Sequence, residues 1–332
     1  MYRMKIHYTL DESAARLPLA IRSTEGVWDH VAALRTAPGV HLVELTTQHV
    51  LNTGAVLVDE LAHYFEEGAP SEADPYQLKT CYANRAVLED LLRDLSEAPL
   101  ATLDEVEALF PPSVEHELSV LLALTVVGVP AFGYVRTYND SEGEEYHGIV
   151  VNLAQARPHL EEALGQFSLS LLIDTIRYGL FNHEVFQLAY ASFCEAIGRT
   201  PDRLSDRLKN NLMSRGIAWY VGYRHDLAFY DDAQSAPETG LEAQVHQWNA
   251  LVAGVGKKKF ADWLVDDLSH AAGESSQASE QCIDVVGYHV ARMLVDHYGE
   301  SSLRESVAQG PDTFLSLYNA LGEYQLDGTV RA

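Results

Sequence analysis

The chain has 332 residues, a length that suits one large domain or two modest ones. Hydrophobic residues make up 47% of it and charged residues 21%, so the chain can bury a core and wholesale disorder is excluded. Asp and Glu number 48 against 23 Lys and Arg, which gives a formal net charge of −25. Because binding to phosphates or anionic lipids requires many cations, we expect neither a nucleic-acid partner nor a membrane partner.

The cysteines and the apolar segments indicate a reduced, cytoplasmic protein. Cys81, Cys194 and Cys282 are widely spaced, so the sequence indicates neither a disulfide framework nor a thiolate zinc site. The first residues contain cations but lack the apolar core of a signal peptide. The apolar run from Leu118 to Val135 is as long as a membrane span, but Gly and Pro interrupt it. We predict a buried helix that turns into a strand there.

Residues 1–130 form a first region that is mostly helical in pattern. Apolar residues recur near a 3.6-residue period from Gln48 to Glu67 and from Ala86 to Leu95, which predicts two helices. Two segments rich in β-branched and aromatic residues, Met4 to Leu10 and Val40 to Leu45, are predicted to be short strands.

Residues 131–332 form a second region, which could also be continuous with the first in one compact unit. Two strands, Ala131 to Tyr138 and Tyr146 to Leu153, flank strong turn residues and predict a hairpin. Helical patterns then follow at residues 158–197, 202–211, 216–229, 283–297 and 314–321. The predicted fold class is mainly α (α+β), with a small antiparallel sheet.

One segment carries the residues of a known catalytic motif. In an H-E-x-x-H helix, two imidazoles one turn apart bind zinc, and the glutamate deprotonates the metal-bound water. This chain has His183 and Glu184, but Gln187 replaces the second histidine. A His-Glu pair alone arises easily by chance in a chain with 14 histidines, so the surrounding motifs decide its interpretation.

Three later segments accompany this helix: Arg215-Gly-Ile-Ala218, Asp284-Val-Val-Gly287 and Phe314-Leu-Ser-Leu-Tyr-Asn319. Together with the preceding hairpin, they resemble zinc-dependent metallopeptidases of the gluzincin type, which have a zincin-like fold. That family shows H-E-x-x-H, E-G-I-A, Y-x-x-G and F-x-x-x-Y-N motifs in this order. The resemblance covers residues 132–319 and implies an edge strand that lies over the active-site-type helix.

The residues that carry the chemistry depart from the family pattern. His183 matches the first metal ligand and Glu184 the general base, whereas Gln187 and Arg215 stand at the second and third ligand positions. Asp284 stands where the family has its tyrosine. A neutral amide is a poor zinc ligand, and a guanidinium has no available lone pair. By the resemblance, His183 is therefore a vestigial ligand and no cofactor is expected.

The leading hypothesis is a zincin-like protein that has lost zinc peptidase activity and keeps a cleft for a peptide or protein. The resemblance places four residues near this cleft: Tyr220, Tyr223, Asp284 and His147. One alternative is an active metal-dependent hydrolase with non-standard ligands, such as His183 with His225, which would then bind zinc. Another alternative is an α-helical interaction protein without active-site ancestry. The sequence does not indicate an oligomeric state.

Two structural expectations follow from the leading hypothesis. The segment from Thr175 to Ala196 lacks Pro and is predicted to be one continuous helix. Without a metal, the shielded carboxylate of Glu184 needs another cation. We therefore expect the guanidinium of Arg215 within about 4 Å of Glu184, the usual limit of an ion pair.

Overall fold

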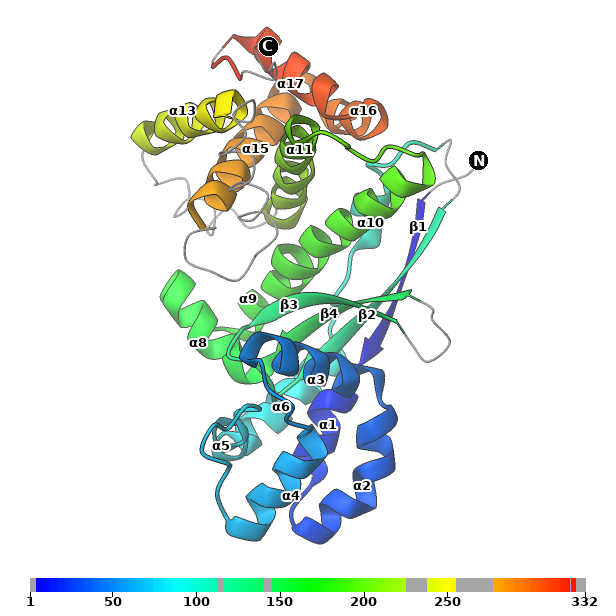
Figure 1. Ribbon diagram of the computed structural model, residues 1–332, viewed down its shortest axis with the longest axis vertical. Coiled ribbons are helices and arrows are strands. Elements are labelled where there is room, and N and C mark those ends of the chain that lie inside the picture. The colour runs from blue at the N-terminus through cyan, green and yellow to red at the C-terminus, as the bar shows by residue number, and fades with distance from the viewer. Residues whose placement is uncertain are drawn as a thin grey trace. The chain divides into compact units, whose positions relative to one another are not determined.

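The computed structural model describes residues 4–112, 116–139, 145–224, 238–254, 277–322 and 324–326. The protein is mainly helical with a small four-stranded sheet, so the predicted α+β class is confirmed (Figure 1). No described helix has the length and apolar character that crossing a membrane requires. Residue contacts divide the chain into two compact units, and each unit draws on both sides of residue 130.

The first of these, here the sheet unit, comprises Ile6–Ala101 and Ser119–Phe181. It contains most of the strands β1 (Met4–Asp11) and β2 (His116–Thr125), and all of β3 (Gly133–Asn139) and β4 (Glu145–Asn152). Its helices are α1 (Ser13–Ala20), α2 (Thr24–Thr36), α3 (Pro38–Leu51), α4 (Leu57–Glu67), α5 (Leu78–Ala83), α6 (Arg85–Ser96), α8 (Leu153–Leu164) and α9 (Leu169–Asp174). The predicted strand at Met4 to Leu10 and the helix at Ala86 to Leu95 are both confirmed.

The sheet has the order β1-β2-β4-β3 (Figure 1). The predicted hairpin is confirmed, because β3 and β4 pair antiparallel, with Val135 opposite Ile149; residues 140–144 between them lie outside the described part of the chain. The expectation of an all-antiparallel sheet is wrong, because β2 runs parallel to β4, with Leu122 opposite Ile149. A parallel neighbour requires a crossover connection, and the chain reaches β4 from β2 by way of β3.

The prediction of a helix at the start of the run from Leu118 to Val135 is wrong. This segment forms β2 and then β3. Every residue from Leu122 to Val129 is buried, so both faces of the end of β2 are covered. A strand covered on both faces has a continuous apolar sequence, which periodicity cannot distinguish from a buried helix.

The predicted strand at Val40 to Leu45 is also wrong, because these residues lie inside α3. Pro38 occupies the first turn of this helix, and Val40, Val43 and Thr47 form one buried stripe at helical spacing. On β4, Gly148 leaves room for the side chain of Leu42, since a Cβ atom there would lie 2.3 Å from a Leu42 methyl carbon. Packing of this helix on the sheet overrides the β propensity of its residues.

The predicted helix from Gln48 to Glu67 is interrupted. The helix α3 ends at Leu51, and α4 begins at Leu57. Between them, Asn52 adopts the left-handed conformation, with φ of 47°, which ends the helix as a C-cap. Val50 and Leu51 are consequently exposed at the end of α3 and do not belong to an apolar helix face.

The second compact unit, here the helical unit, comprises Met1–Lys5, Thr102–Leu118 and Asn182–Ala332. Its described helices are α7 (Leu103–Glu107), α10 (His183–Ala196), α11 (Leu204–Tyr223), α13 (Glu238–Gly254), α15 (Gln277–Tyr298), α16 (Ser301–Gln309) and α17 (Pro311–Leu321). The helical stretches predicted at residues 202–211 and 216–229 belong to one helix, α11, as far as Tyr223, and residues 225–229 lie outside the described part of the chain. The predicted helices at residues 283–297 and 314–321 lie within α15 and α17.

Two glycines bring α11 and α15 into backbone contact. A Cβ atom on Gly216 would lie 2.3 Å from the carbonyl group of Gly287, and one on Gly287 would lie 2.4 Å from the carbonyl oxygen of Leu212. Any larger residue at either position would therefore push the helices apart. Because the two helices approach so closely here, side chains next to the glycines, such as Arg215 on α11 and Asp284 on α15, come within reach of each other.

The segment from Thr175 to Ala196 is helical throughout, but it is not a single α-helix. Residues Thr175–Asn182 form a π-helix, η1, and α10 begins at His183. The predicted continuous helix is thus confirmed, and its first eight residues have π-helical instead of α-helical geometry. A π-helix of this length is rare, and π-helical turns occur frequently at functional sites. The preceding predicted run from residue 158 is broken at Gly165, whose φ of 65° ends α8.

Candidate functional site

The first turn of α10 places the residues of the degenerate motif next to each other. His183 is 8% exposed, and the side-chain amide of Gln187, one turn later, donates a hydrogen bond of 2.8 Å to its Nε2. Glu184 extends from the same turn, with its Oε1 4.0 Å from Nε2 of His183. Gln187 therefore satisfies the imidazole nitrogen that faces Glu184, and the proton of His183 belongs on Nδ1.

His183 is a neutral imidazole at physiological pH. Its pKa is lowered to about 3, mainly by burial and further by the positive charge of Arg215, while a hydrogen bond to the backbone of Ala218 acts in the opposite direction. Nδ1 is buried and forms no hydrogen bond of normal geometry within the described residues. The backbone of Ala218 lies near enough to raise the pKa of His183, so it is the partner available to the Nδ1 proton among the described contacts.

The pKa of Glu184 lies above the usual range of a glutamate. Its pKa is raised from 4.5 to about 7: burial is the main cause, the guanidinium of Arg215 opposes it, and the carboxylate of Asp284 adds to it. Its side chain is 27% exposed, so the carboxyl group still reaches solvent. A glutamate that titrates near neutrality beside a neutral histidine is the usual setting for proton transfer.

Arg215 forms a two-bond ion pair with Asp284, not with Glu184. Its Nε and Nη2 donate to the two carboxylate oxygens at 2.6 and 2.8 Å, and both side chains are largely buried. The expected ion pair between Arg215 and Glu184 is wrong, since no such contact within 4 Å occurs among the described residues. The physical reason is the glycine contact: Arg215 directly precedes Gly216, and Asp284 lies one turn before its partner, Gly287. The guanidinium still acts on Glu184 through its charge.

Aromatic side chains of α11 extend the site along one face. Trp219 contacts His183 edge to face, with ring centroids 5.0 Å apart, and stacks on Tyr223 at 4.8 Å. The predicted cleft residues Tyr223 and Asp284 thus belong to the same cluster as His183. For Tyr220, burial raises the pKa and the nearby charges are those of Arg224, Glu300 and Asp296, so its predicted place in the cleft stays a prediction.

His147 lies in the sheet unit, on β4, where its Nδ1 is 3.0 Å from the Thr137 hydroxyl of β3. The two units are described separately, so its predicted place in a cleft with His183 stays a prediction.

The residues at the ligand positions do not fit zinc. Gln187 uses its amide group on His183, and the guanidinium of Arg215 is neutralised by Asp284. Within the described ranges, no three His, Cys, Asp or Glu residues lie close enough together to hold a metal. His225, the ligand suggested for an active enzyme, lies outside the described residues.

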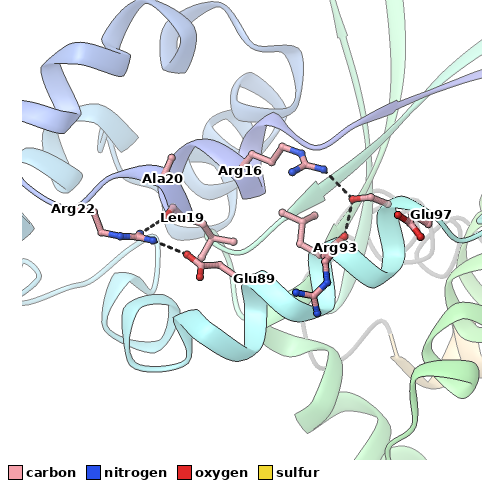
Figure 2. A pocket seen from close by; sticks show the side chains of 9 residues that line it. Arg16, Leu19, Ala20, Arg22, Glu89, Arg93 and Glu97 are labelled. Carbon is pink, nitrogen blue, oxygen red and sulfur yellow. Dashed lines mark hydrogen bonds and ion pairs between the residues drawn. The ribbon is translucent and has the colours of Figure 1, made fainter.

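A surface groove of about 470 Å³ lies elsewhere, between α1 and α6 of the sheet unit (Figure 2). Arg22 and Arg93 line it, but each is paired with a carboxylate, Glu89 and Asp90 respectively, at 2.8 Å. Arg16 donates to Ser96 across the groove. None of the candidate site residues predicted from the sequence lines this groove. The positive charges of Arg22 and Arg93 are neutralised by their ion pairs with carboxylates of the same chain.

Comparison with known proteins identifies no relative. The chain matches no protein-family model, no curated protein and no solved structure. The resemblance to gluzincin-type metallopeptidases therefore stays a prediction that rests on the motifs alone.

Proposed function

We propose that this protein is a zincin-like protein without zinc peptidase activity, which binds a peptide or protein segment at the cluster around His183. The observation that carries the proposal is the ion pair of Arg215 and Asp284 at the third ligand position. This pair joins α11 and α15 by two charge-assisted hydrogen bonds, and it engages the residue at the third ligand position in a contact that leaves no group there for a metal.

The cluster has the properties of a binding site for a segment with free hydrogen-bond donors. Glu184 accepts no hydrogen bond from any described residue, although a carboxylate has four acceptor positions. Trp219 contacts the neighbouring His183 and stacks on Tyr223, and aromatic residues of this kind contribute strongly to recognition of peptides. A donor of the bound segment would stabilise the ionised form of Glu184 and lower its pKa.

The motif alignment is tested by restoring the ligands. The double variant Gln187→His with Arg215→Glu should bind zinc tightly, whereas each single variant should bind it much more weakly, because zinc sites use at least three protein ligands. Isothermal titration with zinc measures this, with circular dichroism to confirm folding. A folded double variant that takes up no zinc would show that the alignment is wrong.

The loss of catalysis is tested on the wild-type protein. Peptides that bind the wild-type protein are first selected on a peptide array. When each is incubated with the protein and monitored over time by mass spectrometry, it should remain uncleaved. Cleavage of a bound peptide, or one equivalent of zinc in the purified protein, would overturn the proposal. The second candidate function, a hydrolase with non-standard ligands, would then be favoured, and the near-neutral pKa of Glu184 supports that role.

The proposal places the protein in the cytoplasm. All three cysteines are buried free thiols, and burial raises the pKa of Cys81 and Cys282 to about 12. Thiols of this kind are inert, and reduced cysteines are usual in that compartment.

A further inference from the structure

Two side chains of α10 present hydrogen-bond acceptors beside His183. The NH2 group of Gln187 lies 2.8 Å from Nε2 of His183, and the carboxylate of Glu184 lies 4.0 Å from the same atom. Residues three apart on a helix are neighbours on its surface, so these two side chains share one face. Within the described part of the chain, neither the carbonyl oxygen of Gln187 nor the carboxylate of Glu184 accepts a hydrogen bond. Acceptors from two side chains therefore lie close together at this point.

The described donors at the same place are already engaged. The NH2 group of Gln187 donates to His183. Two nitrogens of Arg215 donate to the carboxylate of Asp284, and this ion pair balances both charges. The ionised carboxylate of Glu184 then leaves the cluster with a net negative charge. A positively charged hydrogen-bond donor is the ligand chemistry that complements such a site.

Aromatic rings from α11 supply apolar surface next to His183. Trp219 contacts the imidazole edge to face, and Tyr223 stacks on Trp219. Both aromatic residues are half-buried, so part of their surface reaches solvent. The methylene stem of a lysine packs on apolar surface while its charged end stays with polar groups, and ammonium groups are attracted to aromatic rings. The cluster therefore combines the two kinds of surface that a lysine side chain has.

We propose that this site recognises a lysine side chain of the bound peptide or protein segment, an inference that rests on the function proposed above. The ammonium group donates to Glu184 and to the carbonyl oxygen of Gln187, and the methylene stem packs on Trp219. An ammonium group has three rotatable donors, which suits acceptors from two separate side chains better than the planar fork of arginine. The net charge of −25 also favours association with a basic segment.

The lysine side chain is favoured over the amino group at the end of a peptide because the acceptors are recessed. The side chain of Glu184 is only 27% exposed, and that of His183 is 10% exposed. A lysine stem of four methylene groups reaches such a carboxylate without burial of the peptide backbone, whose own polar groups would then need partners.

Peptides that differ only in the ammonium group test the proposal. N-acetylated peptides that contain lysine and bind the wild-type protein are selected on an array and resynthesised with a fluorescent label. In matched peptides, norleucine, which has an alkyl side chain without the ammonium group, or arginine replaces the lysine. Fluorescence anisotropy at pH 8, above the pKa of Glu184, gives the dissociation constants. Norleucine should raise the dissociation constant at least about tenfold, and arginine should raise it several-fold.

The variant Glu184→Gln identifies the partner of the ammonium group on the protein. It keeps the shape of the side chain and removes the charge, so it should weaken binding of the lysine peptide at least about tenfold and change binding of the norleucine peptide little. A loss of folding would weaken both peptides alike, and circular dichroism checks for it. Glu195→Gln, an exposed position on the same helix, is the matched control and should bind both peptides as the wild type does.

Four outcomes would overturn the inference. Equal binding of the lysine peptide and of its norleucine or arginine counterpart would exclude recognition of the lysine. Equal loss of the lysine and norleucine peptides in folded Glu184→Gln would exclude the carboxylate as its partner. A second array with free amino termini tests the remaining source of an ammonium group, and binding of those peptides alone would show that the site takes a chain end. In these three cases the proposed binding function stands, whereas a failure of the protein to bind any peptide on either array overturns that function as well.

Discussion

We predict that ionisation of Glu184 lowers the free energy of unfolding at neutral pH. Its pKa is 4.5 in an unfolded chain and about 7 in the folded one, because burial penalises its charge. Between these values the folded chain holds the Glu184 proton and the unfolded chain does not, so this group makes stability fall as the pH rises. Above pH 7 both states are ionised and the loss is complete.

The size of the effect follows from the same two pKa values. Their separation corresponds to roughly 3 kcal/mol, since one pKa unit is equivalent to about 1.4 kcal/mol. The side chain is 27% exposed, and water therefore screens part of its charge. We expect the free energy of unfolding to lose about 2 kcal/mol from this group between pH 4.5 and pH 7.

The variant Glu184→Gln isolates this contribution, because glutamine has the shape of a protonated glutamate and does not titrate. Urea unfolding at pH 4 and pH 8 should show nearly equal stability of the two proteins at pH 4, below the pKa of the unfolded state. At pH 8, the variant should be more stable by about 2 kcal/mol. Glu195→Gln, an exposed position on the same helix, is the control and should differ little at either pH. Equal differences between wild type and Glu184→Gln at both pH values would refute the reasoning.

Three further substitutions test the contacts that build the two units. Arg215→Met removes the partner of the largely buried Asp284 and should lower the free energy of unfolding by about 2 kcal/mol, while NMR titration should show a higher pKa for Glu184. Gly216→Ala should cost at least about 3 kcal/mol, because its Cβ meets backbone atoms that cannot move separately. Gly54→Ala, with no atom within 4 Å of the added Cβ, should be nearly neutral and serves as the control. Asn152→Ala removes the N-cap of α8 and a buried hydrogen bond to Val129, and should cost about 2 kcal/mol in thermal or urea unfolding.

The periodicity of apolar residues in the sequence predicted the amphipathic elements, which have one face buried and the other exposed. The amphipathic helix α6 and the β3–β4 hairpin were predictable because their apolar residues recur at the period of the element itself. The motif at His183 and Glu184 was also visible in the sequence, as was the unusual Arg215 before Gly216. These features depend on residues close together in the chain.

Tertiary packing decided the rest. Whether the apolar run after Leu118 is a strand or a helix depends on the parallel pairing of β2 with β4, which lies more than twenty residues further on. The partner of Arg215 depends on the approach of α11 to α15, which the missing Cβ atoms of Gly216 and Gly287 permit across about seventy residues of chain. The near-neutral pKa of Glu184 arises from the same packing, because burial and the charges of Arg215 and Asp284 act through space. Sequence periodicity reports only which face of an element is apolar, and it contains no information about which distant side chain lies against that face.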